Sequence, residues 1–165
     1  MIDVSGFGTG ITIVALQSFP MGFSLSQFAD DTDPIVFEEV ETSDIELLYD
    51  GSLFAYDVAS AVRMSVSVIP GSNDDINLKI LLSARKGSSS IIPLPDTTTA
   101  VISYPDGGRV ILSNGTITKG PLADSITQQG RRKANTYSFA FGSFGGFQSA
   151  KQVVATVAST VLSLL

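Results

Sequence analysis

The residues best placed to do chemistry in this sequence are carboxylates. Five of them fall within nine positions: Glu38, Glu39, Glu41, Asp44 and Glu46. Two such groups on either side of a bound sugar would serve glycoside hydrolysis. No aromatic platform for a sugar accompanies them beyond Tyr49, Phe54 and Tyr56, and the chain contains no Trp. We therefore interpret the cluster as an exposed acidic face and keep a carboxylate-based hydrolase as the most distant alternative.

A second acidic run precedes this cluster and resembles part of a calcium-binding loop. A loop that started at Asp30, with Asp31 and Asp33 following, would place Glu41 at its twelfth position. Its sixth position would be Ile35, where an EF-hand requires glycine. A solvated turn is therefore the favoured interpretation, and we expect no metal site here.

Missing residue types exclude several other kinds of chemistry. Among its 165 residues the chain has no His, so general acid–base catalysis would need a strongly shifted carboxylate or lysine. It also has no Cys, which removes thiol nucleophiles, cysteine-bound metals and disulfides. Serines are abundant, but no Gly-x-Ser-x-Gly elbow accompanies them. We expect a protein that is not an enzyme and that carries no cofactor.

Charge is divided unevenly along the chain. Residues 1–78 hold 13 acidic residues and one basic residue, Arg63, which sum to −12, whereas nine basic and three acidic residues in 79–165 sum to +6. This asymmetry points to a charged partner, and that partner can be a second copy of the same chain. Two solvated faces of a monomer are the simpler alternative.

The most concentrated basic segment is Arg131-Arg132-Lys133. Three cations in a chain with a net charge of −6 would give only weak, salt-sensitive binding to nucleic acid. A contact with an acidic neighbouring protein explains these residues equally well.

The sequence predicts a mostly β structure to position these charged residues. The clearest pattern is residues 62–68, in which four apolar residues alternate with three polar ones, as in a half-buried strand. A similar alternation begins at Gly10, and residues 136–141 alternate small with aromatic side chains. Residues 100–104 and 109–112 flank a Pro-Asp-Gly-Gly turn and predict a hairpin.

Weaker β patterns lie elsewhere in the chain. Residues 16–28 contain a Pro-Met-Gly kink, which favours a bent or edge strand. Residues 35–41 and 45–49 are strand candidates, and an Asp-Gly turn signal follows the second. Ser113-Asn114-Gly115 predicts a further turn that separates the hairpin from residues 116–118.

One helix is predicted before Gly87. Ser72, Asn73 or Asp74 can cap its N-terminus, acidic residues occupy its first turn, and basic residues occupy its last. Its apolar residues supply a surface that can pack on the sheet. The expected fold class is therefore mainly β with one flanking α-helix.

The C-terminal segment is apolar and has its own pattern. The spacing of apolar residues in 147–165 fits a second helix, with a strand as the alternative. The apolar run is too short for a membrane span, and no basic region at the N-terminus suggests a secretory signal. Length indicates a single domain over residues 1–165, in which 143–165 form a C-terminal extension.

Five segments together give the sequence a resemblance to a known family. They are residues 18–23, 27–34, 68–78, 104–107 and 136–141. In this order and spacing they resemble a bacteriophage tail tube protein, which forms the inner tube of a long-tailed phage. The resemblance spans residues 9–141 and does not include the apolar tail.

The resemblance implies a small β-barrel or β-sandwich of tail-tube type with one flanking helix. Six copies of such a protein form a ring, and the rings stack into a hollow tube through which the genome and the tape-measure protein pass. It implies a virion protein made in the host cytoplasm, with sheath, baseplate and tail terminator proteins as further partners and no specific binding of DNA. A ring or hub protein of a phage baseplate or of a contractile secretion-type system is the alternative.

Two groups of charged residues acquire expected roles in such an assembly. An acidic channel would repel DNA phosphates, so the genome could slide without sticking. The candidates for lining the channel are Glu38, Glu39, Glu41 and Glu46. The candidates for contacts with the acidic half of a neighbouring subunit are Arg131, Arg132 and Lys133.

Overall fold

The computed structural model describes residues 6, 8–87, 96–148, 159 and 161–164. In chain order the strands and the helix are β1 (Gly10–Ala15), β2 (Phe19–Leu25), β3 (Ile35–Phe37), β4 (Ser43–Leu47), β5 (Leu53–Asp57), β6 (Val62–Val68), α1 (Asn73–Lys86), β7 (Thr98–Ser103), β8 (Arg109–Lys119) and β9 (Asn135–Gln148). The expectation of a mainly β fold with one flanking helix is confirmed.

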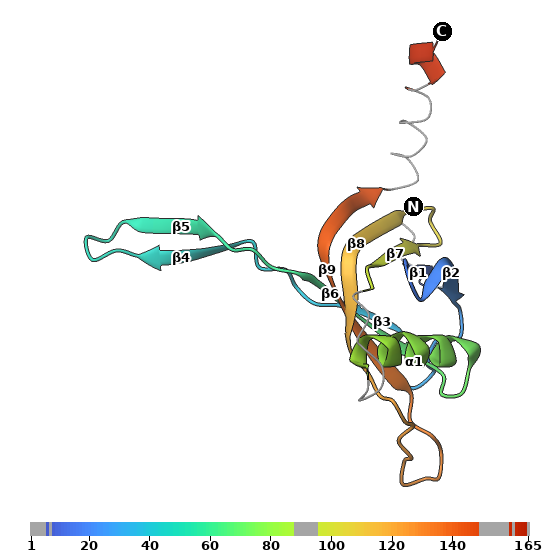
Figure 1. Cartoon of the computed structure of the whole chain (residues 1–165). Coiled ribbons are helices and arrows are strands. Elements are labelled where there is room, and N and C mark those ends of the chain that lie inside the picture. The colour runs from blue at the N-terminus through green and yellow to red at the C-terminus, as the bar shows by residue number, and fades with distance from the viewer. Residues whose placement is uncertain (1–5, 7, 88–95, 149–158, 160, 165) are drawn as a thin grey trace.

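Seven of the strands form one antiparallel sheet in the order β2-β1-β7-β8-β9-β6-β3. The sheet curls into an open half-barrel, and β2 and β3 are its two edges (Figure 1). The predicted hairpin is confirmed as β7 and β8, and the kinked segment is confirmed as an edge strand, β2.

The core lies between one face of this sheet and α1. Ile11 and Ile13 of β1 are fully buried, and Met64 and Val66 of β6 are buried on the same side, as the period-two patterns predict. The aromatic residues of β9 complete the core. Its largest fully buried side chains are Tyr137, Phe139, Phe141, Ile11, Ile13, Leu25, Met64, Leu78, Leu81, Ile102, Leu112 and Val66.

Helix α1 begins and ends as the sequence predicts. The Ser72 side chain accepts a hydrogen bond from the Asp75 N–H at 3.2 Å, and Gly87 ends the helix with a φ of 68°. Leu78 and Leu81 of α1 face the sheet and are buried. The helix therefore acts as the lid of the half-barrel core.

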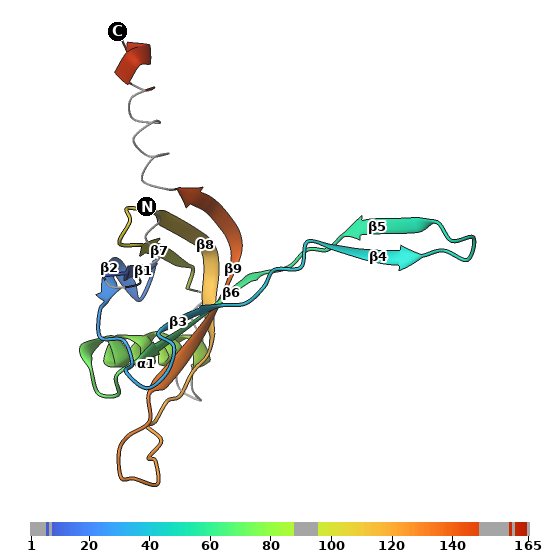
Figure 2. The same cartoon turned by 180° about the vertical axis from the view of Figure 1, so that it is seen from behind.

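Strands β4 and β5 form a separate two-stranded ribbon, which we call the arm together with the segments 38–42 and 58–61 that connect it to the sheet. Figures 1 and 2 show, from opposite sides, that the arm projects away from the rest of the molecule, which we call the body. The sequence indicated β4 and the Asp50-Gly51 turn, but it did not indicate β5.

The predicted turn at Ser113-Asn114-Gly115 is wrong, because β8 runs without interruption through these residues. Asn114 has a φ of 55°, and the pairing of β8 with β7 shifts register here, so the residues form a bulge rather than a turn. A Cβ on Gly115 would lie 2.2 Å from the Phe141 ring and 2.8 Å from the Ala140 carbonyl oxygen. Glycine is therefore required by close packing against β9.

Strand β9 continues to Gln148, so residues 143–148 of the expected C-terminal extension are part of the sheet. The predicted C-terminal helix is wrong at residues 147 and 148, which belong to β9. Residues 159 and 161–164 are helical and exposed, and residues 149–158, 160 and 165 lie outside the described residues. Within the part of the chain that the structure describes, no helix is long and apolar enough to cross a membrane.

Candidate assembly interface

The arm combines apolar and acidic side chains without any base. Residues 38–61 include seven acidic residues and no Lys or Arg. All but one of these 24 positions are exposed, and Val58 is half-buried. The large apolar side chains among them are exposed by 40% to 109% of their surface: Val40, Ile45, Leu47, Leu48, Tyr49, Leu53, Phe54 and Tyr56.

Strand pairing sorts the arm into two different faces. Ile45 lies opposite Ala55, and Leu47 lies opposite Leu53, so one face is entirely apolar at these positions. On the other face the acids Asp44 and Glu46 lie opposite aromatic residues. This second face places carboxylates next to Tyr56 and Phe54, whose ring centroids are 6.0 Å apart.

The interactions that hold β4 and β5 together are local. Its tip turn is closed by a hydrogen bond from the Leu48 N–H to the Ser52 carbonyl at 2.8 Å, and the Tyr56 hydroxyl donates to Asp44 at 3.1 Å. An isolated two-stranded hairpin is marginally stable in water. The arm is therefore a segment whose faces remain available for another molecule to cover.

The four expected channel acids lie along this arm. Glu38, Glu39 and Glu41 are in the connecting segment between β3 and β4, and Glu46 lies on β4. The Glu38 N–H donates to the Arg63 carbonyl at 3.1 Å, which extends the pairing of β3 with β6 by one residue. All four side chains are exposed along the arm, which has no opposed walls of the kind that a glycosidase site requires.

The basic triplet lies in the loop between β8 and β9, and its arginines meet acids of their own chain. Arg131 forms an ion pair with Asp30, and Arg132 donates to Asp124 at 2.8 Å. The pairing with Arg131 lowers the pKa of the Asp30 carboxyl. The Lys133 N–H donates to the Ser125 carbonyl at 2.7 Å, which fixes the backbone of the loop.

A buried polar network beneath this loop was not evident from the sequence. Asp75 of α1 accepts hydrogen bonds from the Tyr137 hydroxyl at 2.7 Å and from the Asn135 amide at 2.8 Å, and Lys79 lies 3.1 Å from its other oxygen. Lys79 also pairs with Asp124, to which Asn135 donates at 2.8 Å. Only the Asp75–Lys79 spacing of four residues in the helix signals this network in the sequence.

The network holds both carboxyl groups in the charged form. Burial raises the pKa of Asp75, but hydrogen bonds from Gly71, Tyr137, Asn135 and Lys79 outweigh it, so the pKa lies below its ordinary value. Hydrogen bonds from Lys79 and Asn135 lower the pKa of Asp124 to about 2. These shifts indicate a structural role, because every polar group in the network already has its partner within the chain.

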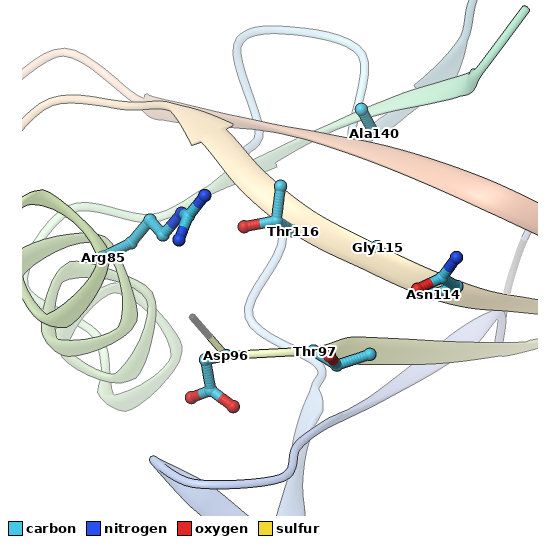
Figure 3. A pocket seen from close by; sticks show the side chains of 7 residues that line it. All are labelled: Arg85, Asp96, Thr97, Asn114, Gly115, Thr116 and Ala140. Carbon is cyan, nitrogen blue, oxygen red and sulfur yellow. The ribbon is translucent and has the colours of Figure 1, made fainter. Parts of the chain in front are cut away.

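A pocket of about 260 Å³ lies between α1 and the start of β7, and Figure 3 shows its lining. Arg85 reaches into it from the helix, and Asp96 lies across from it. The Asp96 carboxylate accepts hydrogen bonds from the Gln17 and Ser18 N–H groups, both at 2.9 Å. Asp96 thus fastens the turn between β1 and β2.

The arm is therefore the strongest candidate for an interface, because its apolar side chains are exposed.

Among the described residues, no group of three or more His, Cys, Asp or Glu side chains is arranged to hold a metal ion.

Comparisons with known proteins place the chain among tail components. Residues 2–145 match the family described as tail fiber protein gp32. A chain in the cryo-EM structure of the anti-feeding prophage baseplate aligns with a TM-score of 0.52 and 11% identity, over 90% of this chain and 95% of that one. A chain in the cryo-EM structure of the anti-feeding prophage cap aligns with a TM-score of 0.49 and 12% identity, over 91% and 93%. No curated protein matches the sequence.

Proposed function

The chain belongs to the tail fiber protein gp32 family, and from this premise we propose that it is a structural subunit of a phage tail that assembles with copies of itself. In the form that we favour, hexameric rings stack into a hollow tube that conducts the genome. The fold serves this role through shape and charge.

The arm is the observation that carries the proposal. Its apolar face and its aromatic residues are exposed on a ribbon that the body does not cover. Contiguous exposed apolar surface on a soluble protein marks a site of protein–protein contact. Burying the arm against neighbouring subunits would stabilise both the ribbon and the assembly.

The open edges of the sheet support the same proposal. Among the described residues, β2 and β3 each have one side without a neighbouring strand, and β3 is only three residues long. Neighbouring subunits that pack against these edges would cover their free backbone groups. A ring of identical copies does this for every subunit at once.

The acidic residues would allow DNA to pass through the proposed channel without sticking. We place Glu38, Glu39 and Glu41, at the root of the arm, and Glu46 on β4 in the lining of the channel, where they would repel DNA phosphates. We also retain the basic triplet as a contact with the acidic half of a neighbour. Lys133 carries most of this second role, because Arg131 and Arg132 have acidic partners within their own chain.

The second candidate is a ring or hub protein of a phage baseplate or of a contractile secretion-type system. The motive for it is the fold shared with a chain of the anti-feeding prophage baseplate, whose structure is six-fold symmetrised. Both candidates use the arm to hold copies together, and they differ in whether rings continue into a tube.

Electron microscopy of the purified full chain tests the proposal directly. Long tubes support the tube, single rings support the second candidate, and monomers at high protein concentration contradict both. The variant Leu47→Ser/Leu53→Ser makes a directly opposed pair on the apolar face of the arm polar. We expect it to abolish assembly, whereas Ile76→Ser, a control on α1 where Ile76 is 49% exposed, leaves assembly unchanged.

A further inference from the structure

A basic groove lies at the end of the body where α1 and β8 finish. Its volume is about 380 Å³, and its lining residues are Leu82, Arg85, Lys86, Ile117, Thr118, Lys119, Gly120 and Leu122. Three of them are basic and none is acidic. The groove is therefore an apolar hollow with a positively charged rim.

The floor of the groove is part of the rigid core. Leu82 and Ile117 are buried, and Leu122 beside them is 48% exposed. Gly120 passes so close to the body that a Cβ there would lie 2.4 Å from the Tyr137 ring. The Tyr137 hydroxyl donates a hydrogen bond to Asp75, so this wall of the groove is fixed by the buried network.

Two of the three basic residues of the rim, Lys86 and Lys119, leave their charge available. Lys86 and Lys119 are exposed, and neither ammonium group has an ion-pair partner within the described part of the chain. An occupant of the groove should therefore present apolar side chains together with negative charge.

We propose that the tip of the arm of a second copy occupies this groove. In this arrangement Leu48 and Tyr49 enter the apolar hollow, while Asp50 meets the basic rim. The proposal rests on the self-assembly proposed above and names the two surfaces that meet. The tip cannot serve its own groove, because the arm projects away from the body in both views (Figures 1 and 2).

Size and charge both suit this occupant. Tyr49 is fully exposed at the tip, and Leu48 beside it is 48% exposed. A cavity of about 150 Å³ accommodates a benzene ring, so a groove of about 380 Å³ has room for a tyrosine ring and a leucine side chain. The arm carries seven acids and no base, which makes its charge opposite to that of the rim.

The contact would also propagate. The tip and the groove are different surfaces of one molecule, so each copy can donate its tip to one neighbour and receive the tip of another. Such head-to-tail contacts generate closed rings when the rotation closes and continuing filaments when it does not.

Cross-linking between two single-cysteine proteins tests this contact. The chain has no Cys, so Tyr49→Cys and Leu122→Cys introduce the only thiols. We expect a short bismaleimide reagent to join Tyr49→Cys to Leu122→Cys in mixed samples, and much less to join Tyr49→Cys to Ile76→Cys on α1, where Ile76 is 49% exposed. Equal yields for the two mixtures would overturn the proposal. So would a preference of Leu122→Cys for Ile76→Cys over Tyr49→Cys, because a surface other than the tip of the arm would then occupy the groove.

Charge reversal provides a second readout. We expect Lys86→Glu/Lys119→Glu to weaken self-association by about 100-fold, because like charges would then face each other across the contact. The control Arg63→Glu/Arg109→Glu changes the net charge equally at exposed positions outside the groove and should have little effect. Copies that still form rings or tubes without the Tyr49–Leu122 cross-link would refute this contact alone, whereas copies that stay monomeric would refute both this contact and the proposed assembly.

Discussion

The body and the arm each contain an aspartate that accepts a hydrogen bond from a tyrosine hydroxyl, but in opposite surroundings. In the body, Tyr137 donates to Asp75 at 2.7 Å, and the Asp75 side chain is 1% exposed. In the arm, Tyr56 donates to Asp44 at 3.1 Å, and both residues are exposed. The same pair of groups therefore contributes to a buried network in one region and to a solvated surface in the other.

The difference shows how the chain divides its interactions. The body satisfies its buried charges within one subunit, since Asp75 meets Lys79, Asn135 and Tyr137. The arm leaves both its apolar face and its acids uncovered. Stability of the monomer should therefore depend on the body, and association of copies should depend on the arm.

The strongest test of this division is Asp75→Ala. Removal of the carboxylate takes away the acceptor that Tyr137, Asn135 and Lys79 share. Breaking a buried ion pair by removing one partner typically costs about 3–5 kcal/mol of stability. We expect the free energy of unfolding, measured by urea denaturation, to fall by this amount.

Asp44→Ala is the matched control, because it removes the equivalent acceptor from Tyr56 in the arm. We expect it to change the free energy of unfolding by less than about 0.5 kcal/mol, as for other exposed substitutions. Equal losses in the two variants would contradict the division between body and arm.

A smaller effect is expected from the pH dependence of the same network. The pKa of Asp124 is about 2 in the folded chain, below the value of about 3.9 for an unfolded aspartate. The unfolded state therefore binds the proton first as pH falls, and the stabilisation present above pH 4 is lost towards pH 2. Stability should decline across this window, and Asp124→Asn should reduce the decline.

Circular dichroism during urea titrations at several pH values measures this slope. Asp50→Asn on the arm is a useful comparison, since the Ser52 hydroxyl and N–H also lower the pKa of Asp50 but its side chain is fully exposed. A slope that changed as much in Asp50→Asn as in Asp124→Asn would show that the hydrogen bonds from Lys79 and Asn135 are not the source of the effect.

The sequence predicts the body better than the arm, for a physical reason. β1, β6 and α1 each have one buried face, so apolar residues recur with the period of the element. β5 has the sequence Leu-Phe-Ala-Tyr-Asp and is exposed throughout. Because neither of its faces is buried, its apolar and polar residues do not alternate. β5 is a strand because it pairs with β4, and the hydrophobic pattern of an exposed strand does not reveal such pairing.

Sequence patterns also did not predict contacts between residues that lie far apart in the chain. Asp75, Asp124 and Asn135 meet only because the loop between β8 and β9 folds back towards α1. The Asn-Gly signal at residues 114–115 is local and was overridden, since β8 continues across it as a bulge packed on β9. The uneven distribution of charge along the chain was visible in the sequence. The ion pairs Arg131–Asp30 and Lys79–Asp75 nevertheless join some acids of the first half to bases of the second half within one monomer.

The smallest expected effect comes from a leucine in the arm. Leu47 is 73% exposed, whereas Leu112 of β8 is fully buried. Leu112→Ala should cost about 2–5 kcal/mol, because it creates a cavity in the core. Leu47→Ala should change the free energy of unfolding by less than about 0.5 kcal/mol when measured at concentrations low enough to keep the chain monomeric. Only at concentrations that support assembly should Leu47→Ala become visible, as a loss of association in sedimentation experiments. If it instead destabilised the monomer as much as Leu112→Ala, the arm would have to be folded onto its own body in solution.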